Sequence, residues 1–539
     1  MPIRITGLNS GLDTEAIISE LVSAYRTKEE KYQKAQTKLS WKQDAWKSLN
    51  IKVKSMYDNI KNLRFSSAWS KQKTTVSDAT KATITASGSA AKGTQTLEIK
   101  QLAKGTYITG GELKTNDQST LSSGTTLAQL GYTGDGASIN VKDSDGNVLK
   151  TINVTQKTTI SGLLNELNGV GKLTATFDAS NKRMFVTAKN TGVENGISLD
   201  GDADVLKAFG LNANGGAKVV DAQDSEIVLN DAKFTSSNNK YSINGLSIDC
   251  LGETNGSKIS ITTSADTQGM YDQIKSFFSQ YNSLLSEMNS LYNADSAKGY
   301  EPLTSEEKDA MTDTEVEEWE KKIKSALLRR DDNLDSIMSL MKNAMTSSYY
   351  VYQGGTVTYD STNKYYKCNG TALKDSNGNN ITSASQLKSW ASANGAAKYS
   401  LSSFGIKTQA YLTATSNSQG TYHIDGDEDD TVSKDNSDVL MNMLNSDSDT
   451  VTAFMKQITG DLYTALDNKM KSTKDLNSAY TIYNDKEMAR EYSDYTDTIS
   501  KWEDKLTDLE DYYYKKFAAM ESALASLQSQ SSSLSSLLS

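Results

Sequence analysis

Few side chains in this sequence could carry chemistry, and they are scattered along the chain. Its one histidine, His423, follows Tyr422, and no nucleophile and carboxylate stand with it at a spacing typical of a catalytic triad. The acidic run 425–430 could hold a hard cation through its oxygens. However, it lacks the alternate ligand spacing and the distal glutamate of a calcium loop. We therefore interpret it as a solvated acidic loop.

Other candidate sites also have simpler interpretations. The Asp/Asn-rich segments 143–147 and 375–379 have the composition of β-turns, so we expect hairpin tips rather than cation sites. Cys250 and Cys368 lack a Cys-x-x-Cys spacing and are predicted to be free thiols. The sequence contains no phosphate-binding Gly-Lys-Ser/Thr loop, and no pair of carboxylates is singled out for glycoside cleavage. It thus predicts no catalytic residue, no cofactor and no metal site.

The two ends of the chain share a long apolar rhythm. Apolar residues recur every three and four positions from Ile18 to Leu63, interrupted only by Lys28 and Lys42. The same step runs from Ile499 to Leu538, with one stutter of four plus four residues. Such a narrow stripe is typical of a coiled-coil seam. Both ends are therefore predicted to belong to one helical stem.

These helical ends carry opposite charge. Residues 20–75 hold 13 Lys/Arg and 5 Asp/Glu, whereas residues 421–515 hold 10 Lys/Arg and 22 Asp/Glu. Because flanking charges set partner choice in helical bundles, we expect the two segments to be neighbours. Solvated helix faces that merely differ in charge are the alternative. The net charge of −10 disfavours nucleic acid as a partner.

The middle of the chain is β-rich. Alternating Thr, Val and Ile with frequent turns extends from residue 74 to about 263. Asp145-Gly146 and Asn244-Gly245 are hairpin turn signals. Two short helices are expected there, over 159–167 and over 203–209.

Helical periodicity returns from Asp266. A further helix is expected over 315–345, a β-rich insert over about 349–424, and helices from near Asn436 onward. This order predicts an α+β multidomain fold, in which a helical coiled-coil stem from both termini carries inserted β-rich domains. The predicted domains are 1–45 with 499–539 as terminal coiled-coil segments that are disordered until assembled, 46–73 with 266–498 as a helical leg domain, 74–110 with 219–265 as a β-rich head domain, and 111–218 as a second head domain.

Membrane and export signals are also not expected. No apolar stretch approaches the ~20 residues that span a bilayer. The segment 1–11 lacks a basic n-region and an apolar h-region, so no ordinary secretory signal is expected.

Several motifs point to one known family. Residues 5–18, ITGLNSGLDTEAII, closely resemble the N-terminal signature of the flagellar hook-associated protein 2 family, the filament cap proteins (FliD family). The runs 39–46, 93–103, 299–308 and 401–406 are similar to that family too. Flagellin is the nearest competitor, but its start looks different from the Gly-Leu-Asn-Ser-Gly-Leu-Asp-Thr found here.

The resemblance implies a function in assembly. It implies a flagellin-like nested architecture and an extracellular protein at the tip of the bacterial flagellum, secreted by type III export without a cleaved signal peptide. The resemblance also implies a homo-oligomeric ring of about five subunits. It promotes flagellin folding and insertion during filament elongation and prevents flagellin loss, without catalysis. The implied partners are further copies of the chain, flagellin, hook-associated junction proteins and an export chaperone.

The apolar stripes are the predicted assembly interface. An adhesin that binds host mucin or glycans through the β-rich domains is the alternative function, and a tail-tip hydrolase is a third. The predicted interface residues are Leu8, Leu12, Ile18, Leu21, Tyr25, Tyr32, Leu39, Trp46, Trp502, Leu506, Leu509, Phe517, Leu524, Leu527, Leu534 and Leu538.

Overall fold

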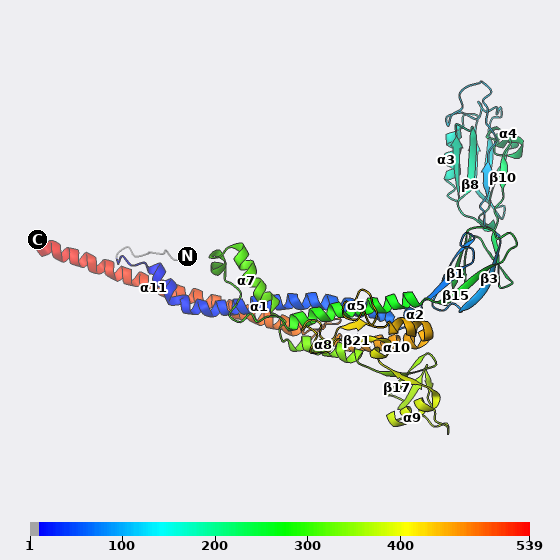
Figure 1. Cartoon of the computed structure of the whole chain (residues 1–539). Coiled ribbons are helices and arrows are strands. Elements are labelled where there is room, and N and C mark those ends of the chain that lie inside the picture. The colour runs from blue at the N-terminus through cyan, green and yellow to red at the C-terminus, as the bar shows by residue number, and fades with distance from the viewer. Residues whose placement is uncertain (1–9, 539) are drawn as a thin grey trace. The chain divides into compact units, whose positions relative to one another are not determined.

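The chain divides into two compact units (Figure 1). The computed structural model describes residues 10–538, with side chains up to residue 535. The terminal unit comprises the residues up to Trp69 and those from Gln268 onward, and the β-rich unit comprises Ser70–Thr267. Each unit has its own hydrophobic core and is described by itself.

Two long helices from opposite ends of the chain pair in the terminal unit. Helix α1 spans Thr14–Leu63 and begins at Asp13, whose carboxylate accepts the Ala16 N–H at 3.0 Å. Helix α11 spans Asp485–Leu538. The helices are antiparallel, because Arg26 binds Glu510 near one end and Gln36 binds Thr496 further along. The predicted helical stem is confirmed.

Shorter helices complete this unit, and one of them differs from the prediction. The helix expected over 315–345 is broken: α7 ends at Ser325, and α8 begins after Asp331, whose carboxylate accepts the N–H of Asn333 and Leu334. Arg330 has a φ of 53°, which no α-helix accommodates. The helices are α2 (Ser66–Trp69), α5 (Thr267–Tyr292), α6 (Ser305–Asp309), α7 (Asp313–Ser325), α8 (Asp332–Met345) and α10 (Val439–Lys469).

Aromatic rings anchor the C-terminal half of α1. Trp46 is buried and stacks on Tyr483, with ring centroids 5.5 Å apart. Tyr57 stacks on Tyr463 of α10 and donates a hydrogen bond of 2.8 Å to Asp467. Burial, followed by these hydrogen bonds, raises the pKa of the Tyr57 phenol well above its ordinary value. This half of α1 is therefore part of a packed core.

A β-rich insert follows α8. Its five strands pair in the order β19-β18-β17-β16-β20, and helix α9 (Ala384–Asn394) covers them through Leu387 and Trp390. The sequence analysis did not predict α9, although Ser383 and Gln386 form a capping box that is readable in the sequence. The strands are β16 (Tyr349–Tyr352), β17 (Gly355–Asp360), β18 (Tyr365–Cys368), β19 (Thr371–Ala372) and β20 (Ala397–Tyr399), followed by the separate pair β21 (Ile406–Thr408) and β22 (Tyr422–Ile424).

The β-rich unit contains two hydrophobic clusters. The first draws its buried side chains from 82–99 and 227–261 and lies between the sheets β1-β15-β3-β11-β12 and β13-β14-β2. Every strand pair in these sheets is antiparallel. The strands are β1 (Gln72–Val76), β2 (Ala82–Ala86), β3 (Gly93–Gln101), β11 (Ser225–Leu229), β12 (Ala232–Ser236), β13 (Lys240–Ile243), β14 (Leu246–Cys250) and β15 (Ile259–Ala265).

The second cluster draws its buried side chains from 108–217. It joins the sheets β10-β4-β8-β7 and β6-β5-β9 to helices α3 (Ile160–Asn168) and α4 (Ala203–Ala208), which confirms both predicted short helices. The predicted division of the whole chain into four domains stays a prediction. The strands are β4 (Tyr107–Thr109), β5 (Ala137–Asp143), β6 (Val148–Val154), β7 (Leu173–Asp178), β8 (Arg183–Ala188), β9 (Ile197–Gly201) and β10 (Lys218–Val220).

The hairpin turn at Asn244-Gly245 offers a test of local packing. Both residues have positive φ, 46° and 81°, as a two-residue hairpin loop requires. A Cβ on Gly245 would stand 2.9 Å from the Ala90 backbone. We expect Gly245→Ala to cost about 1–3 kcal/mol more than Gly256→Ala, because overpacking adds to the backbone strain that both share. Gly256 has a φ of 84° and open space around it. Faster hydrogen exchange of the β13 and β14 amides in the Gly245 variant alone would confirm the prediction, and equal exchange in both variants would contradict it.

Candidate assembly interface

The interpretation of the acidic run as a solvated loop is wrong for Asp425 and Asp427, whereas Glu428 and Asp429 are exposed. Asp425 and Asp427 are buried, and Lys407 binds Asp425 at 2.6 Å while Lys275 binds Asp427 at 2.6 Å. The hydrogen bonds that Lys275 donates to Asp427 and then to Asp429 raise the pKa of Lys275 well above its ordinary value. Within the described residues, no group of His, Cys, Asp or Glu side chains is arranged to hold a metal ion. The run therefore fastens β21 and β22 to α5.

The remaining chemical candidates have structural roles. Nδ1 of His423 in β22 lies 2.8 Å from the carboxylate of Asp430, in the acidic run that follows this strand. The Asp143 carboxylate accepts backbone N–H groups of its own hairpin, and Asp375 does the same in the insert, as predicted for hairpin tips. Cys250 and Cys368 are buried free thiols, and burial raises the pKa of Cys250 to about 11. A thiol with so high a pKa is a poor nucleophile.

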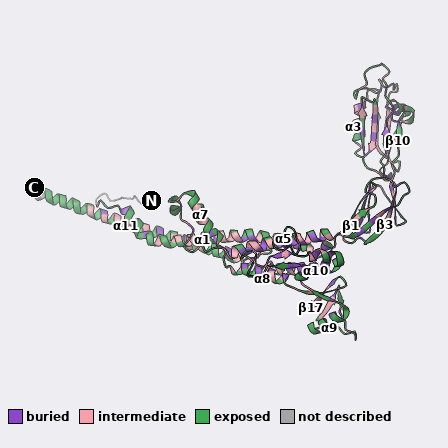
Figure 2. Cartoon of the chain, viewed as in Figure 1, coloured by how far each residue is buried: buried purple, intermediate pink, exposed green. Residues whose placement is uncertain are grey.

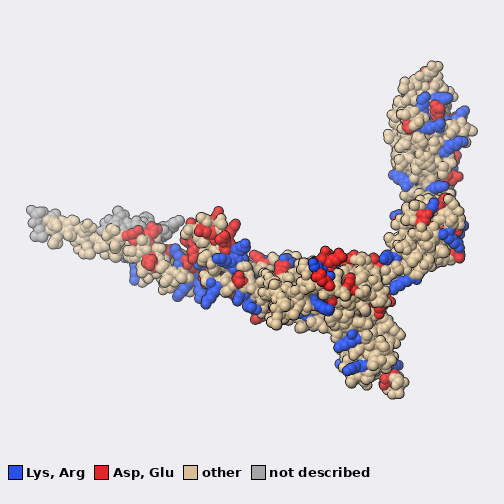
Figure 3. All heavy atoms as spheres, in the orientation of Figure 1, with Lys and Arg blue, Asp and Glu red and all other residues tan. Residues whose placement is uncertain are grey.

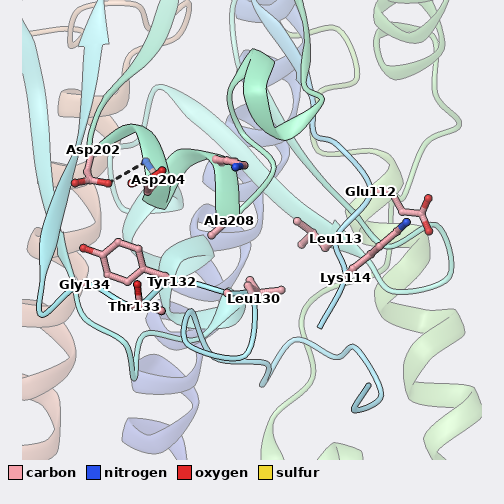
Figure 4. Close-up of a pocket in the computed structure, with 12 residues that line it drawn as sticks. Glu112, Leu113, Lys114, Leu130, Tyr132, Thr133, Gly134, Asp202, Asp204 and Ala208 are labelled. Atoms are coloured by element: carbon pink, nitrogen blue, oxygen red, sulfur yellow. Dashed lines mark hydrogen bonds between the residues drawn. The ribbon is translucent and has the colours of Figure 1, made fainter. Parts of the chain in front are cut away.

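One cavity in the β-rich unit has a volume of about 560 Å³ (Figure 4). Asp202 at its wall accepts the backbone N–H groups of Asp204 and Val205 and thereby caps α4. Burial raises the pKa of the Tyr132 phenol, and the charge of Asp202 adds to this effect. The lining contains no histidine and no cysteine.

The predicted interface residues divide into three groups along the α1–α11 pair (Figure 2). Leu12 and Leu21 are 46% and 43% exposed, whereas Val22 is fully buried. The buried position of this turn is therefore Val22, whereas the predicted stripe placed Leu21 there. Leu8 lies outside the described residues, as does the side chain of Leu538. The buried residues are Ile18, Leu39, Trp46 and Leu506, the half-buried ones are Tyr25, Tyr32, Trp502, Leu509, Phe517 and Leu524, and the exposed ones are Leu12, Leu21, Leu527 and Leu534.

The N-terminal half of α1 is held to α11 by a thin contact. Tyr32 and Tyr495 meet with ring centroids 6.4 Å apart, and Arg26 binds Glu510 at 3.1 Å. No side chain between Val22 and Leu39 is fully buried in the described structure. Surface ion pairs contribute little, roughly 0–1 kcal/mol each. Any further surface that covers this half of the helix pair would therefore bury more apolar side chain area and stabilise it.

The basic segment and the acidic segment are neighbours, as expected, because α1 lies beside α11. However, most of the ion pairs that α1 forms with other helices among the described residues do not involve the acidic segment. Arg26 binds α11, yet other lysines of α1 bind carboxylates outside the acidic segment 421–515. Lys34 binds Glu307 at 2.7 Å, Lys42 binds Asp331 at 2.8 Å and Lys52 binds Glu287 at 2.6 Å. Helices α5–α8 therefore share the neutralisation of α1 with α11.

The end of α11 is helical and poorly covered. The helix runs to Leu538, although the sequence analysis expected this segment to be disordered before assembly. Its residues from 525 to 535 are all exposed, including Leu527 and Leu534, and nine serines lie between residues 520 and 539. Serine is a weak helix former, so the helix depends on coverage of its leucines. That it becomes fully ordered only on assembly stays a prediction.

Glu29 faces a like charge across the helix pair. Burial raises the pKa of its carboxyl, and the negative charge of Glu503 adds to this effect. A carboxyl whose pKa is raised on folding stabilises the folded chain below its unfolded-state pKa. This contribution is lost as the pH rises through its folded-state pKa. Ionised Glu29 therefore weakens the pair at neutral pH.

We expect Glu29→Gln to raise the midpoint of thermal unfolding slightly at neutral pH. The gain should vanish below about pH 3.5, where the carboxyl is protonated in both states. Differential scanning calorimetry at several pH values measures it, with Glu20→Gln, an exposed residue of α1, as the control. A gain that persists unchanged at acid pH would contradict the assignment.

No helix among the described residues is both long enough and apolar enough to cross a membrane. The described side chains leave several leucines exposed along the two long terminal helices. The family profile described as flagellar hook-associated protein 2 N-terminus matches residues 10–106, and the profile described as flagellar hook-associated protein 2 C-terminus matches residues 222–529. Because the second match alone spans more than half of the sequence, the chain belongs to the flagellar hook-associated protein 2 family.

Relatives of known name agree with this assignment. The flagellar hook-associated protein 2 of Halalkalibacterium halodurans is 25% identical over 373 residues, covering 63% of this chain and 68% of that protein. The A-type flagellar hook-associated protein 2 of Pseudomonas aeruginosa is 26% identical over 300 residues, covering 52% of this chain and 62% of that protein. The crystal structure of the D1-D2-D3 domains of the flagellar cap protein FliD from Escherichia coli has a TM-score of 0.47 and 17% identity, covering 78% of this chain and 95% of that one.

Proposed function

We propose that the protein is a flagellar filament cap that forms an oligomeric ring at the distal filament tip. There it promotes flagellin folding and insertion during elongation and prevents flagellin loss. The family membership supports this proposal, and one observation carries it: the α1–α11 pair leaves the large apolar side chains of Leu12, Leu21 and Leu527 exposed. Exposed apolar surface in a soluble protein commonly marks an interaction site.

A physical mechanism follows from the length and exposure of the helices. The 50 residues of α1 span about 75 Å at 1.5 Å per residue, enough for a leg that reaches from a ring into a filament end. Each exposed leucine would contribute about 1.5–3 kcal/mol when fully covered. These gains arise only in contact with a neighbour, so each leg can detach and bind again as the filament grows. The cap works by binding and confining flagellin, without a catalytic residue or a cofactor.

The proposal also covers location and partners. We infer an extracellular protein at the flagellum tip, secreted by type III export without a cleaved signal peptide. Its partners are other copies of the chain, flagellin, hook-associated junction proteins and an export chaperone. The four-part domain division, with two β-rich head domains, is part of this proposal.

Electron microscopy of the purified full-length protein tests the ring, and a deletion strain tests the function. We expect ring-shaped particles, together with a strain that secretes unpolymerised flagellin and lacks filaments. A strain with normal filaments would overturn the proposal. The adhesin alternative, in which the β-rich domains bind host mucin or glycans, stays a hypothesis that no described feature favours.

A further inference from the structure

Two lysines on the α1–α11 pair share the same aromatic faces. The Lys28 ammonium lies 5.5 Å from the ring centroid of Trp502 and 5.7 Å from that of Tyr25. The Lys505 ammonium lies 4.8 Å and 5.7 Å from the same two rings. Cations are attracted to ring faces, but two like charges on one pair of rings repel each other. We name Tyr25, Lys28, Trp502 and Lys505 the lysine–aromatic cluster.

The two lysines of this cluster are exposed, and its two aromatic rings are half-buried. Both lysines are exposed, and neither forms an ion pair with a carboxylate in the part of the chain that the structure describes. Lys31, one turn further along α1, is also exposed and without such a pair there. An anionic group placed over the cluster would relieve the repulsion and gain charge-assisted hydrogen bonds.

The chain also carries an acidic surface of matching chemistry. Helices α6 and α7 form an acidic arm, residues 305–325, whose first 14 residues hold seven carboxylates and one lysine. Figure 3 shows carboxylates gathered over this arm and basic side chains on the neighbouring part of the α1–α11 pair. The exposed carboxylates that form no ion pair with another described residue are Glu306, Asp309, Asp313, Glu315, Glu317 and Glu318.

The arm is fixed on a side of α1 other than that of the cluster. Glu307 binds Lys34, and the Lys324 ammonium lies 4.5 Å from the ring centroid of Trp41. At about 100° per residue, Lys34 and Trp41 lie roughly 120–140° around α1 from Lys28. The acidic arm and the lysine–aromatic cluster of one chain therefore lie on different sides of α1.

We propose that the acidic arm of one chain docks on the lysine–aromatic cluster of a second copy of this chain. The contact joins two different surfaces, so it is a head-to-tail contact, and repeated head-to-tail contacts close into a ring when the rotation permits. This inference rests on the proposed ring and names the surfaces that join its subunits. Because the contact is largely electrostatic and at the surface, rising salt should weaken it.

Charge reversal on each side tests the contact in the full-length protein. One variant carries Glu317→Lys with Glu318→Lys, and the other carries Lys28→Glu with Lys505→Glu. We expect each to weaken self-association at least about tenfold by sedimentation velocity at low salt, since like charges then face each other. The variant with all four substitutions, and an equimolar mixture of the two double variants, should associate again. The control, Lys364→Glu with Lys388→Glu, reverses two exposed charges in the insert and should associate as the wild type does.

A crosslink provides a second readout that does not depend on stability. Lys28→Cys with Glu317→Cys should give disulfide-linked oligomers, with low background because Cys250 and Cys368 are buried. Rings that form normally in both charge-reversed variants would overturn this inference and leave the cap function standing. A wild-type chain that stays monomeric at every concentration and salt tested would overturn the ring and the contact together. Recovery of association only in the fourfold variant and the mixture supports the contact specifically.

Discussion

We expect the double substitution Leu12→Lys with Leu21→Lys to leave the isolated chain folded. It should nevertheless abolish filament growth in a strain that has only this variant. Both side chains are about half exposed in the single chain, so the new ammonium groups stay in water there. In an assembly that covers the start of α1, each would be desolvated without a partner, at a cost of several kcal/mol. Because each leg binds only weakly, a desolvation cost of this size would abolish the contact.

Complementation of the deletion strain measures the effect, with filaments counted by electron microscopy and folding checked by circular dichroism. The control, Ser19→Lys with Ala24→Lys, adds the same charge to exposed positions of the same helix without removing a leucine. Filaments of normal length in the leucine variant would remove α1 from the assembly interface. Loss of filaments in the control as well would show that charge alone, rather than the two leucines, is decisive.

Trp46→Ala should lower the free energy of unfolding of the terminal unit by about 3–5 kcal/mol, the usual cost of truncating a large buried aromatic side chain. Trp46 is 1% exposed and stacks on Tyr483, with ring planes 8° apart. It thereby joins the middle of α1 to the segment that leads into α11. Its removal leaves a cavity where the helical pair enters the core.

Urea denaturation followed by far-ultraviolet circular dichroism measures this loss. Ile51→Ala on the same helix is the control, because Ile51 is 69% exposed and its truncation should change stability by less than about 0.5 kcal/mol. Amide exchange of β3 and β15 should be unchanged, since their cluster has its own buried residues. A cost below about 1 kcal/mol for Trp46→Ala would contradict the packing described for α1.

Elements with a strong local signal were predictable from the residues alone. The stripes that begin at Ile18 and Ile499 predicted α1 and α11, because helical periodicity is a property of one segment. The Asn244-Gly245 turn between β13 and β14 was equally readable, because only residues that tolerate positive φ suit it. The break between α7 and α8 was missed, because residues on both sides of it keep a helical apolar spacing. The left-handed backbone conformation of Arg330 also has no signature in the residue type.

The environment of the candidate site was less predictable. The acidic run 425–430 has the composition of a solvated loop, and the neutralisation of Asp427 and Asp429 depends on Lys275, which lies more than 150 residues away in the sequence. Val22 is buried where the predicted stripe placed Leu21, because the rotation of a helix about its axis depends on the side chains that pack against it. Two adjacent apolar residues of a helix are equally good candidates for the buried position when only the sequence is known.

The helical ends, the β-rich middle and the family follow from the order of the residues, because periodicity, turn residues and motifs lie within short segments. The packed fold sets which charges are neutralised, which leucines stay exposed and where the acidic arm lies relative to the lysine–aromatic cluster. These properties depend on distances between residues far apart in the chain. Such distances exist only after the backbone has folded and its helices have packed.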